Sequence, residues 1–434
     1  MNQNFYEVIP INRPIDSTVE VPGSKSITNR ALLLAALSEG ETVLNGALFS
    51  EDVRAFLESL KAMGVSVREE EEKKRITVSG RGCDGWNPSG TIHVGSAGTA
   101  ARFLTALIGI AGLEYEIQAS EQMQARPMQE LFDALTGLGA RIEYLGQEGH
   151  LPARAAAKRA GSEPVEISLD ISKSTQYLSA LLMMAPFFEQ GLTIRITSEK
   201  KTGSYVEITR SMMRQFGIDV QFDGTSYTIA PGSRYRTPGI YEIEPDVSAA
   251  CYFYAAAAIT GGSVTVRGVR REMMQGDVRF LDVLKEMGCY LSEKPAGLRV
   301  TGPIPGRLKG ISVDMNDFSD QALTLAAIAP YADSMVEIRN VEHIRGQECD
   351  RLRAISENMR KLHLMCEEAR DSVRIYPGKP ESAELESYGD HRVAMAFAIL
   401  GLRARDICIM DPACCAKTFP DFFRVLEELD KTDF

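Results

Sequence analysis

One pattern recurs about six times along this 434-residue chain, at a spacing of about 70 residues. Each copy has a short polar cluster, a helix of small residues, a strand, and a second, amphipathic helix that ends near a glycine. Such self-similarity indicates a repeat architecture, in which neighbouring copies bury a shared core. The polar clusters stand at 23–26, 95–99, 172–176, 246–248, 317–320 and 388–392.

The polar clusters have the composition of helix N-caps, so we expect a helix to begin at each of them. The first N–H groups of a helix have no partner within the helix, and the helix dipole places partial positive charge there. Several such helix starts converging on one space would bind anions. The repeats therefore predict a site that handles phosphate or carboxylate groups.

The second helices support the same period independently of the polar clusters. Their apolar residues recur at helical spacing, and a glycine follows most of them as a helix stop. Such a stripe is typical of a face packed on the core. The predicted ranges are 52–64, 128–139, 206–217, 277–288, 350–362 and 419–429.

Six copies divide naturally into two sets of three, which predicts an α/β (α+β) protein with two pseudo-threefold domains. The last copy lacks strands after its second helix, whereas spare strand-like segments at 5–9 and 18–21 precede the first copy. We therefore expect one domain at 23–244 and a second that combines 1–22 with 245–434. The chain would cross between the domains near Pro22 and Pro245, and this double crossing would act as a hinge around a site between the halves.

Composition excludes several classes of protein. A net charge of -11 without a compensating basic tract argues against nucleic-acid binding. The eight cysteines form no CxxC pair, as expected of reduced thiols in a cytoplasmic protein. No apolar run is long enough to cross a bilayer. We expect a cytoplasmic monomer without membrane contact.

Two segments are predicted to lie at the surface, a loop at 146–161 and a hairpin tip at 68–75.

Cations near the predicted helix starts carry the chemical argument. A cation at a helix N-terminus is repelled by the positive end of the helix dipole, and a bound anion would offset this repulsion. Asp320 and Glu348 stand among these cations, where a carboxylate can accept or donate a proton. No metal-ligand spacing, P-loop or dinucleotide motif is present, so we expect neither metal nor cofactor. The cations are Lys25, Arg30, Arg102, Arg126, Arg351, Arg392 and Lys417.

At these positions the chain resembles the 5-enolpyruvylshikimate-3-phosphate synthase family of enolpyruvyl transferases. The similarity spans nearly the whole chain, and its motifs occur in order. The matching stretches are Pro22-Gly23-Ser24-Lys25-Ser26 with Asn29-Arg30, Ala97-Gly98-Thr99-Ala100 with Arg102, Arg126-Pro127, Glu348 with Asp350-Arg351, Asp390-His391-Arg392, and Ala416-Lys417-Thr418-Phe419-Pro420-Asp421.

The resemblance implies two domains built from six βαβαββ-like units. It also implies transfer of the enolpyruvyl group of phosphoenolpyruvate to the 5-hydroxyl of shikimate 3-phosphate, in aromatic amino-acid biosynthesis. Phosphate is released through addition and elimination without a metal. By resemblance, Lys25, Asp320 and Glu348 carry out the proton transfers. The implied phosphoenolpyruvate set is Lys25, Gly98, Arg126, Gln176, Arg351, Arg392 and Lys417, a pocket that glyphosate also occupies in this family.

The implied shikimate 3-phosphate set departs from the family pattern at several positions. Thr175 and Thr202 stand where serine is usual, and His343 with Gln347 replaces an Asn-x-x-x-Lys pair. The neighbouring Lys173 is a candidate replacement for the lost charge. The set is Lys25, Ser26, Arg30, Ser174, Thr175, Gln176, Thr202, Asp320, His343 and Gln347.

Three alternatives stay open on these residues. A diverged enolpyruvyl transferase would act on a different cyclic hydroxyl acceptor. The cell-wall enzyme that uses a UDP-N-acetylglucosamine acceptor typically carries a cysteine before its Arg-Pro, and the loop 118–124 has none. An inactive homologue would only bind metabolites, although such a protein would not need the proton-transferring carboxylates.

Overall fold

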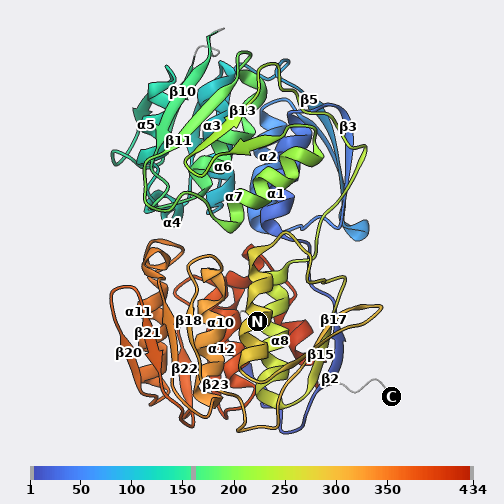
Figure 1. Cartoon of the computed structure of the whole chain (residues 1–434), viewed down its shortest axis with the longest axis vertical. Coiled ribbons are helices and arrows are strands. Elements are labelled where there is room, and N and C mark those ends of the chain that lie inside the picture. Colours follow the sequence, from blue (N-terminus) through green and yellow to red (C-terminus); the bar gives the residue numbers. More distant parts are fainter. Residues whose placement is uncertain (1–3, 158–162, 431–434) are drawn as a thin grey trace. The chain divides into compact units, whose positions relative to one another are not determined.

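The computed structural model describes residues 4–157 and 163–430, and the chain forms two compact units (Figure 1). Unit 1 consists of residues 1–22 and 244–434, and unit 2 consists of residues 23–243. Each unit has three central helices surrounded by outer helices and sheets. This arrangement agrees with the mixed α/β repeat fold expected from the sequence.

The central helices begin at the polar clusters of the repeats. Their residues are buried on almost every side, as expected of helices enclosed by other elements. Small side chains such as the alanines at 255–258 allow close packing there. The central helices are α1 (Lys25–Ala36), α3 (Gly98–Ala111) and α6 (Gln176–Met183) in unit 2, and α8 (Val247–Thr260), α10 (Ala322–Ile328) and α12 (His391–Gly401) in unit 1.

The outer helices lie at the predicted ranges and bury one face each. Gly64, Gly139, Gly217 and Gly288 follow four of them at φ between 92° and 104°, a region that strains other residues. The outer helices are α2 (Glu51–Ala62), α5 (Gln129–Gly137), α7 (Ser204–Gln215), α9 (Phe280–Glu286), α11 (Arg351–Lys361) and α13 (Phe422–Glu428). Shorter helices are η1 (Glu71–Lys73), α4 (Glu121–Gln124), η2 (Ala185–Phe187), η3 (Gly276–Arg279), η4 (Ser319–Gln321), η5 (Ala329–Tyr331), η6 (Glu342–Gly346) and η7 (Pro412–Lys417).

The three sheets of unit 2 share one topology. A parallel pair of strands is followed by two antiparallel strands. In spatial order they are β14 (Ile240–Glu242), β3 (Glu39–Asn45), β5 (Arg75–Arg81) and β4 (Ser66–Glu70); β6 (Ser89–His93), β7 (Glu114–Gln118), β9 (Ala153–Ala156) and β8 (Arg141–Tyr144); and β10 (Val165–Leu169), β11 (Leu192–Ile196), β13 (Ser226–Ile229) and β12 (Val220–Phe222).

Unit 1 repeats this topology, but its last sheet has three described strands. The N-terminal strand β1 (Phe5–Val8) fills the position that a following strand would otherwise take, antiparallel to β23. The remaining strands in spatial order are β2 (Asp16–Val19), β15 (Ser263–Arg267), β17 (Gly297–Thr301) and β16 (Tyr290–Glu293); β18 (Ser312–Asp314), β19 (Val336–Arg339), β21 (Val373–Ile375) and β20 (Cys366–Glu368); and β22 (Ala383–Leu385) beside β23 (Ile407–Met410).

The chain exchanges one strand at each crossing. In most repeats the strand before a central helix pairs in parallel with the strand after it. At the crossings, β2 precedes α1 but pairs with β15, whereas β14 precedes α8 but pairs with β3. Each unit therefore contains one strand that completes a sheet of its own unit. Along the chain, that strand leads into a central helix of the other unit.

The predicted surface loop at 146–161 is wrong at residues 153–156, while residues 146–152 form turns and bends as expected. Residues 153–156 form β9, and Ala153 and Ala155 are buried. Arg154, on the opposite face, pairs with Glu116 and Glu143 at 3.2 Å each. This alternation is that of a strand, but small side chains made it inconspicuous in the sequence. Residues 158–161 lie outside the described residues. The hairpin tip expected at 68–75 is present, with η1 between β4 and β5.

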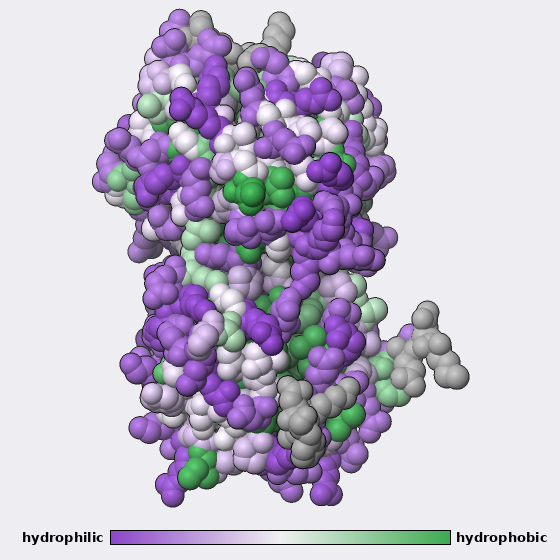
Figure 2. All heavy atoms as spheres, turned by 90° about the vertical axis from the view of Figure 1, so that its right-hand side faces the viewer, coloured by the Kyte–Doolittle hydropathy of each residue, from purple (hydrophilic) through white to green (hydrophobic). Residues whose placement is uncertain are grey.

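The surface drawn in Figure 2 is mostly hydrophilic, with hydrophobic residues in small separate groups. Across residues 4–157 and 163–430, no helix combines the length and apolar character needed to span a bilayer. All eight cysteines are free thiols.

Candidate active site

In unit 2 the predicted residues gather at the starts of the central helices. Lys25 and Ser26 open α1, Gly98 opens α3, and Gln176 opens α6. The N-cap residues of α1 and α3, Ser24 and Ala97, make no side-chain capping hydrogen bond. The expectation that all six polar clusters act as side-chain N-caps is therefore wrong for these two helices. It is also wrong for α6 and α10, whose N-cap residues Thr175 and Gln321 make no such hydrogen bond.

Lys25 is held by a carboxylate of the neighbouring outer helix. Its Nζ lies 2.9 Å from Oδ2 of Asp52, whose side chain is buried in the first turn of α2. The hydroxyl of Ser96 donates to the other oxygen of Asp52 at 3.4 Å. The ammonium group thus has a fixed position and a counterion at the entrance to α1.

Gly98 lies directly against two guanidinium groups. A Cβ atom at this position would lie 2.6 Å from Nη1 of Arg126 and 2.7 Å from Nη1 of Arg102. Such distances are shorter than van der Waals contact. The missing side chain therefore lets Arg102 and Arg126 approach the first turn of α3.

Arg102 joins three segments of unit 2. Its Nη1 donates to Oε1 of Gln176 at 2.9 Å and to the carbonyl of Gly98 at 3.4 Å, while Nη2 donates to the carbonyl of Pro127 at 3.5 Å. The guanidinium also lies 5.4 Å from the ring centroid of Tyr177. The sequence marked Arg102 as a cation near a helix start but gave it no role in a substrate set.

Arg30 is enclosed within the helices of unit 2. Its guanidinium donates to Oγ1 of Thr209 at 2.7 Å and to the carbonyls of Ser26 and Tyr205. The group lies 5.2 Å from the ring centroid of Phe103. Burial lowers the pKa of Arg30 to about 10. In this conformation Arg30 supports the first turn of α1 through the Ser26 carbonyl.

The remaining polar residues predicted in unit 2 surround the starts of α6 and α7. Ser174, which precedes Thr175, accepts a hydrogen bond from the Gln176 N–H at 3.3 Å. Thr202 donates to Glu207 at 2.9 Å. Lys173 pairs with Glu130 at 2.6 Å and is mostly exposed. Its charge is thus already matched by a carboxylate.

In unit 1 the predicted residues form an alternating cluster of cations and carboxylates, with Arg351 at its centre. The Arg351 guanidinium is 1% exposed and donates to Asp390 at 2.7 Å, Asp320 at 2.8 Å and Glu348 at 2.9 Å. A buried guanidinium with carboxylates on several sides is fixed in orientation. These attractions outweigh burial and raise the pKa of Arg351, so it stays charged.

Two further predicted cations reach the same carboxylates. Arg392 lies 3.0 Å from Asp320, and Lys417 lies 3.7 Å from Glu348. Asp390 caps α12 by accepting from the Arg392 N–H at 2.8 Å. The cluster therefore contains fixed cations beside carboxylates that are only partly enclosed, which suits an anionic substrate undergoing proton transfer.

The departures from the family pattern lie beside this cluster. Gln347 accepts a hydrogen bond from Arg351 through its Oε1, and a ring nitrogen of His343 lies 2.8 Å from the Ser319 hydroxyl. Because the guanidinium only donates, Gln347 turns its amide nitrogen away from Arg351. These two positions thus carry an imidazole and an amide where the family pattern has an amide and an ammonium.

Asp277 is a buried carboxyl group that the sequence did not predict. It accepts a hydrogen bond from the Ser248 hydroxyl near the start of α8. Burial and the negative charge of Asp320 raise the pKa of Asp277 to about 7, against the opposing effects of Arg392 and Ser248. The sequence placed Asp277 at the start of the predicted helix 277–288 but gave it no role in the site.

Comparison with known proteins decides the family. The family model described as EPSP synthase (3-phosphoshikimate 1-carboxyvinyltransferase) matches residues 9–426. The chain belongs to the EPSP synthase family. A relative from Trichormus variabilis, named 3-phosphoshikimate 1-carboxyvinyltransferase, is 45% identical over 95% of this chain and 96% of its own. One of the same name from Yersinia pseudotuberculosis is 40% identical over 96% and 97%.

Solved structures of EPSP synthases have the same fold. An EPSP synthase from Acinetobacter baumannii matches with a TM-score of 0.81 and 25% identity, over 98% of this chain and 97% of that chain. The enolpyruvyl transferase NikO from Streptomyces tendae matches with a TM-score of 0.74 and 16% identity, over 98% and 97%, which is a likeness of fold alone.

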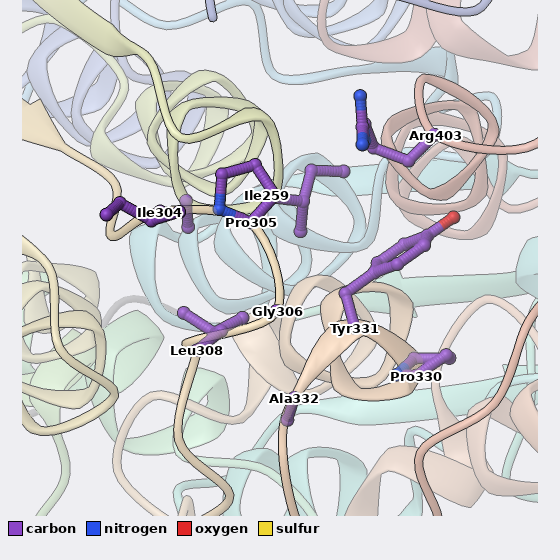
Figure 3. Close-up of a pocket in the computed structure, with 10 residues that line it drawn as sticks. Ile259, Ile304, Pro305, Gly306, Leu308, Pro330, Tyr331, Ala332 and Arg403 are labelled. Carbon is purple, nitrogen blue, oxygen red and sulfur yellow. The ribbon is translucent and has the colours of Figure 1, made fainter. Parts of the chain in front are cut away.

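One cavity of unit 1 is lined by none of the predicted residues (Figure 3). It has a volume of about 280 Å³ and adjoins the C-terminal end of α8 at Ile259, together with Tyr331 and Arg403. The predicted residues of this EPSP synthase family member lie at the opposite, N-terminal ends of the central helices. In the described parts of the chain, no three His, Cys, Asp or Glu side chains are grouped as metal ligands.

Proposed function

We propose that this protein transfers the enolpyruvyl group of phosphoenolpyruvate to the 5-hydroxyl of shikimate 3-phosphate and releases phosphate. The observation that supports this most strongly is the cluster around Arg351, where fixed cations share carboxylates with one another. The cations fit an anionic substrate, and the carboxylates can move protons. Family membership supports the same reaction.

The proposed phosphoenolpyruvate set has members in each unit. Lys25, Arg126, Gln176 and the open first turn of α3 at Gly98 supply donors in unit 2. Arg351, Arg392 and Lys417 supply cations in unit 1. Backbone N–H groups at the starts of α1 and α3 add donors, because their N-cap side chains do not occupy them.

Binding requires an exchange of ion pairs. Arg392 is paired with Asp320, and Lys417 with Glu348. A phosphate or carboxylate of the substrate would replace these internal counterions on the cations. Asp320 and Glu348 would then lose part of the positive charge that holds them as carboxylates, so they become better proton acceptors.

Two proton transfers complete the proposed addition. The 5-hydroxyl oxygen attacks C2 of phosphoenolpyruvate while Asp320 takes the hydroxyl proton. The C2–C3 double bond opens, and C3 takes a proton from the Lys25 ammonium, or from Glu348 after that carboxylate has taken up a proton on substrate binding. The product is a tetrahedral intermediate in which C2 carries the new ether oxygen and the phosphate.

Elimination reverses the second transfer. A carboxylate or amine of the same set removes a proton from C3, the double bond forms again, and the C2–O bond to phosphate breaks. The departing phosphate takes the electron pair and is stabilised by the surrounding cations. Fixed donors aimed at the developing charge would contribute most to the rate.

The proposed acceptor set has members at the starts of α1, α6 and α7 in unit 2, and beside the Arg351 cluster in unit 1. The proposed residues are Lys25, Ser26, Arg30, Ser174, Thr175, Gln176, Thr202, Asp320, His343 and Gln347. Arg30 contributes through its support of α1 in the conformation seen here. His343 and Gln347 bear most directly on which cyclic hydroxyl compound is accepted.

Phosphate release from phosphoenolpyruvate tests the proposal. Turnover should require shikimate 3-phosphate and should be much slower with shikimate or other cyclic alcohols. Turnover only with another alcohol would favour a diverged transferase, and binding without turnover would favour an inactive homologue. Size-exclusion chromatography and fractionation would test the accompanying proposal of a cytoplasmic monomer.

A further inference from the structure

We propose that Arg102 is a positioning residue that fixes the side-chain amide of Gln176 with its nitrogen facing the substrate. This inference rests on the proposed function, because it specifies how one residue of the phosphoenolpyruvate set works. The juxtaposition that carries it is the 2.9 Å contact from Arg102 Nη1 to Gln176 Oε1.

The orientation of the amide follows from the chemistry of its partner. A guanidinium group has donors and no acceptor, so the amide oxygen must face Arg102. The NH2 group then points away from Arg102 with two donors. Gln176 can therefore donate to a phosphate or carboxylate oxygen, and it does not present its carbonyl to a donor on the substrate.

Arg102 is itself firmly placed. It is 3% exposed, and its guanidinium lies against the ring of Tyr177. The Tyr177 hydroxyl donates to the Pro127 carbonyl at 2.7 Å, and Arg102 reaches the same carbonyl. The segment that carries Arg126 is thus tied to α6 through Tyr177 and to α3 through Arg102.

This arrangement connects three contributors to the proposed anion site. Gly98 allows the Arg102 guanidinium to lie over the first turn of α3, Pro127 follows Arg126, and Gln176 opens α6. Arg102 touches all three segments without being assigned to the substrate. Its replacement should therefore weaken phosphoenolpyruvate binding through Gln176 and leave the chemistry of the carboxylates in unit 1 intact.

A double-mutant cycle tests the connection. Arg102→Met and Gln176→Ala should each raise the KM for phosphoenolpyruvate roughly tenfold to a hundredfold, with a smaller change in kcat. In the Gln176→Ala background, Arg102→Met should add less than about a threefold change. Effects that multiply in the double variant would overturn the inference, because Arg102 would then act independently of Gln176.

Gln176→Glu tests the orientation separately. Glutamate keeps an oxygen for Arg102 but replaces the outward NH2 group with a second oxygen, which repels an anionic substrate. Phosphoenolpyruvate binding should fall at least as far as in Gln176→Ala. Binding equal to that of the wild type would show that Gln176 is not an outward donor, and would overturn the inference.

Two further variants separate positioning from folding. Arg102→Lys keeps the charge but loses the planar fork, so it should fold and still raise the KM. Arg234→Met is the matched control, because Arg234 also donates to a backbone carbonyl of unit 2, that of Pro186 at 2.8 Å, and is not a predicted site residue. It should leave the KM unchanged. A wild-type KM in Arg102→Lys would also overturn the inference.

The outcome is distinguishable from failure of the proposed function. Wild-type protein that releases no phosphate from phosphoenolpyruvate with shikimate 3-phosphate refutes the function. Wild-type turnover with multiplicative effects in the cycle refutes only the role of Arg102.

Discussion

Replacing Asp277 by asparagine should make unit 1 more stable relative to wild type as the pH rises from 5 to 8. Asp277 is 6% exposed, and its pKa is raised to about 7 by burial, with a further contribution from the charge of Asp320. Asp246 adds to the increase, while Arg392 and Ser248 oppose it. The neutral carboxyl is thus the favoured form in the folded protein.

The sign follows from proton binding. The unfolded chain releases the Asp277 proton near pH 3.9, whereas the folded chain keeps it to about pH 7. The folded state therefore binds more protons in this interval, and stability falls as the pH rises through it. The stabilisation is fully present below about pH 3.9 and is lost above about pH 7.

The size of the effect follows from the difference of about three pKa units. At about 1.36 kcal/mol per unit, the loss reaches about 4 kcal/mol above pH 7 and about 1 to 2 kcal/mol at pH 5. Asparagine does not ionise, so Asp277→Asn escapes this loss. Its stability relative to wild type should therefore increase by about 2 to 3 kcal/mol between pH 5 and pH 8.

Urea unfolding at constant ionic strength, followed by circular dichroism, measures the difference. The single tryptophan, Trp86, lies in unit 2, so its fluorescence shows whether a transition belongs to the other unit. Asp282→Asn is the matched control, since Asp282 is 56% exposed and pairs with Arg271 at the surface of α9. A difference for Asp277→Asn that is constant with pH, or that decreases, would refute the reasoning.

Three substitutions test the proposed substrate sites. Gly98→Ala should raise the KM for phosphoenolpyruvate and the inhibitory concentration of glyphosate roughly tenfold or more, because its Cβ displaces the Arg126 guanidinium; an unchanged KM would contradict this. Arg126→Ala should raise the KM for phosphoenolpyruvate far more than that for the acceptor, and equal effects would count against the assignment. Gln347→Lys should lower the KM for shikimate 3-phosphate roughly tenfold in steady-state kinetics, and this effect should shrink with added salt. A raised KM would contradict this and would indicate that the new ammonium displaces Arg351.

The repeat pattern was sufficient to predict the helical framework. Both helix sets recur at their predicted positions because periodic apolar residues and a terminal glycine are local signals. The spare N-terminal strands were expected to complete the C-terminal half, and β1 and β2 pair with β23 and β15. The number of repeats thus predicted a pairing between the N-terminal strands and the C-terminal half, which no local pattern contains.

The sequence was less informative where a residue depends on partners far along the chain. β9 was missed because its inward positions are alanines, which give little hydrophobic contrast with a loop. Asp52 and Asp277 looked like ordinary residues of helix starts. Their burial against Lys25 and Ser248 joins the start of an outer helix to the start of the central helix of the same repeat, and this contact appears only once the repeat is folded.

The pairing of charges also explains how a folded protein can hold a site for anions before a substrate binds. A buried guanidinium without a counterion would be strongly destabilising, so Arg351 needs carboxylates before any substrate arrives. The same carboxylates, Asp320 and Glu348, are those proposed to move protons. An arriving anion would take over part of the cationic charge and raise the proton affinity of the carboxylates it displaces. Binding of the phosphoenolpyruvate anion would thereby activate the proton-transferring groups, and a cation cluster without carboxylates could not couple these two events.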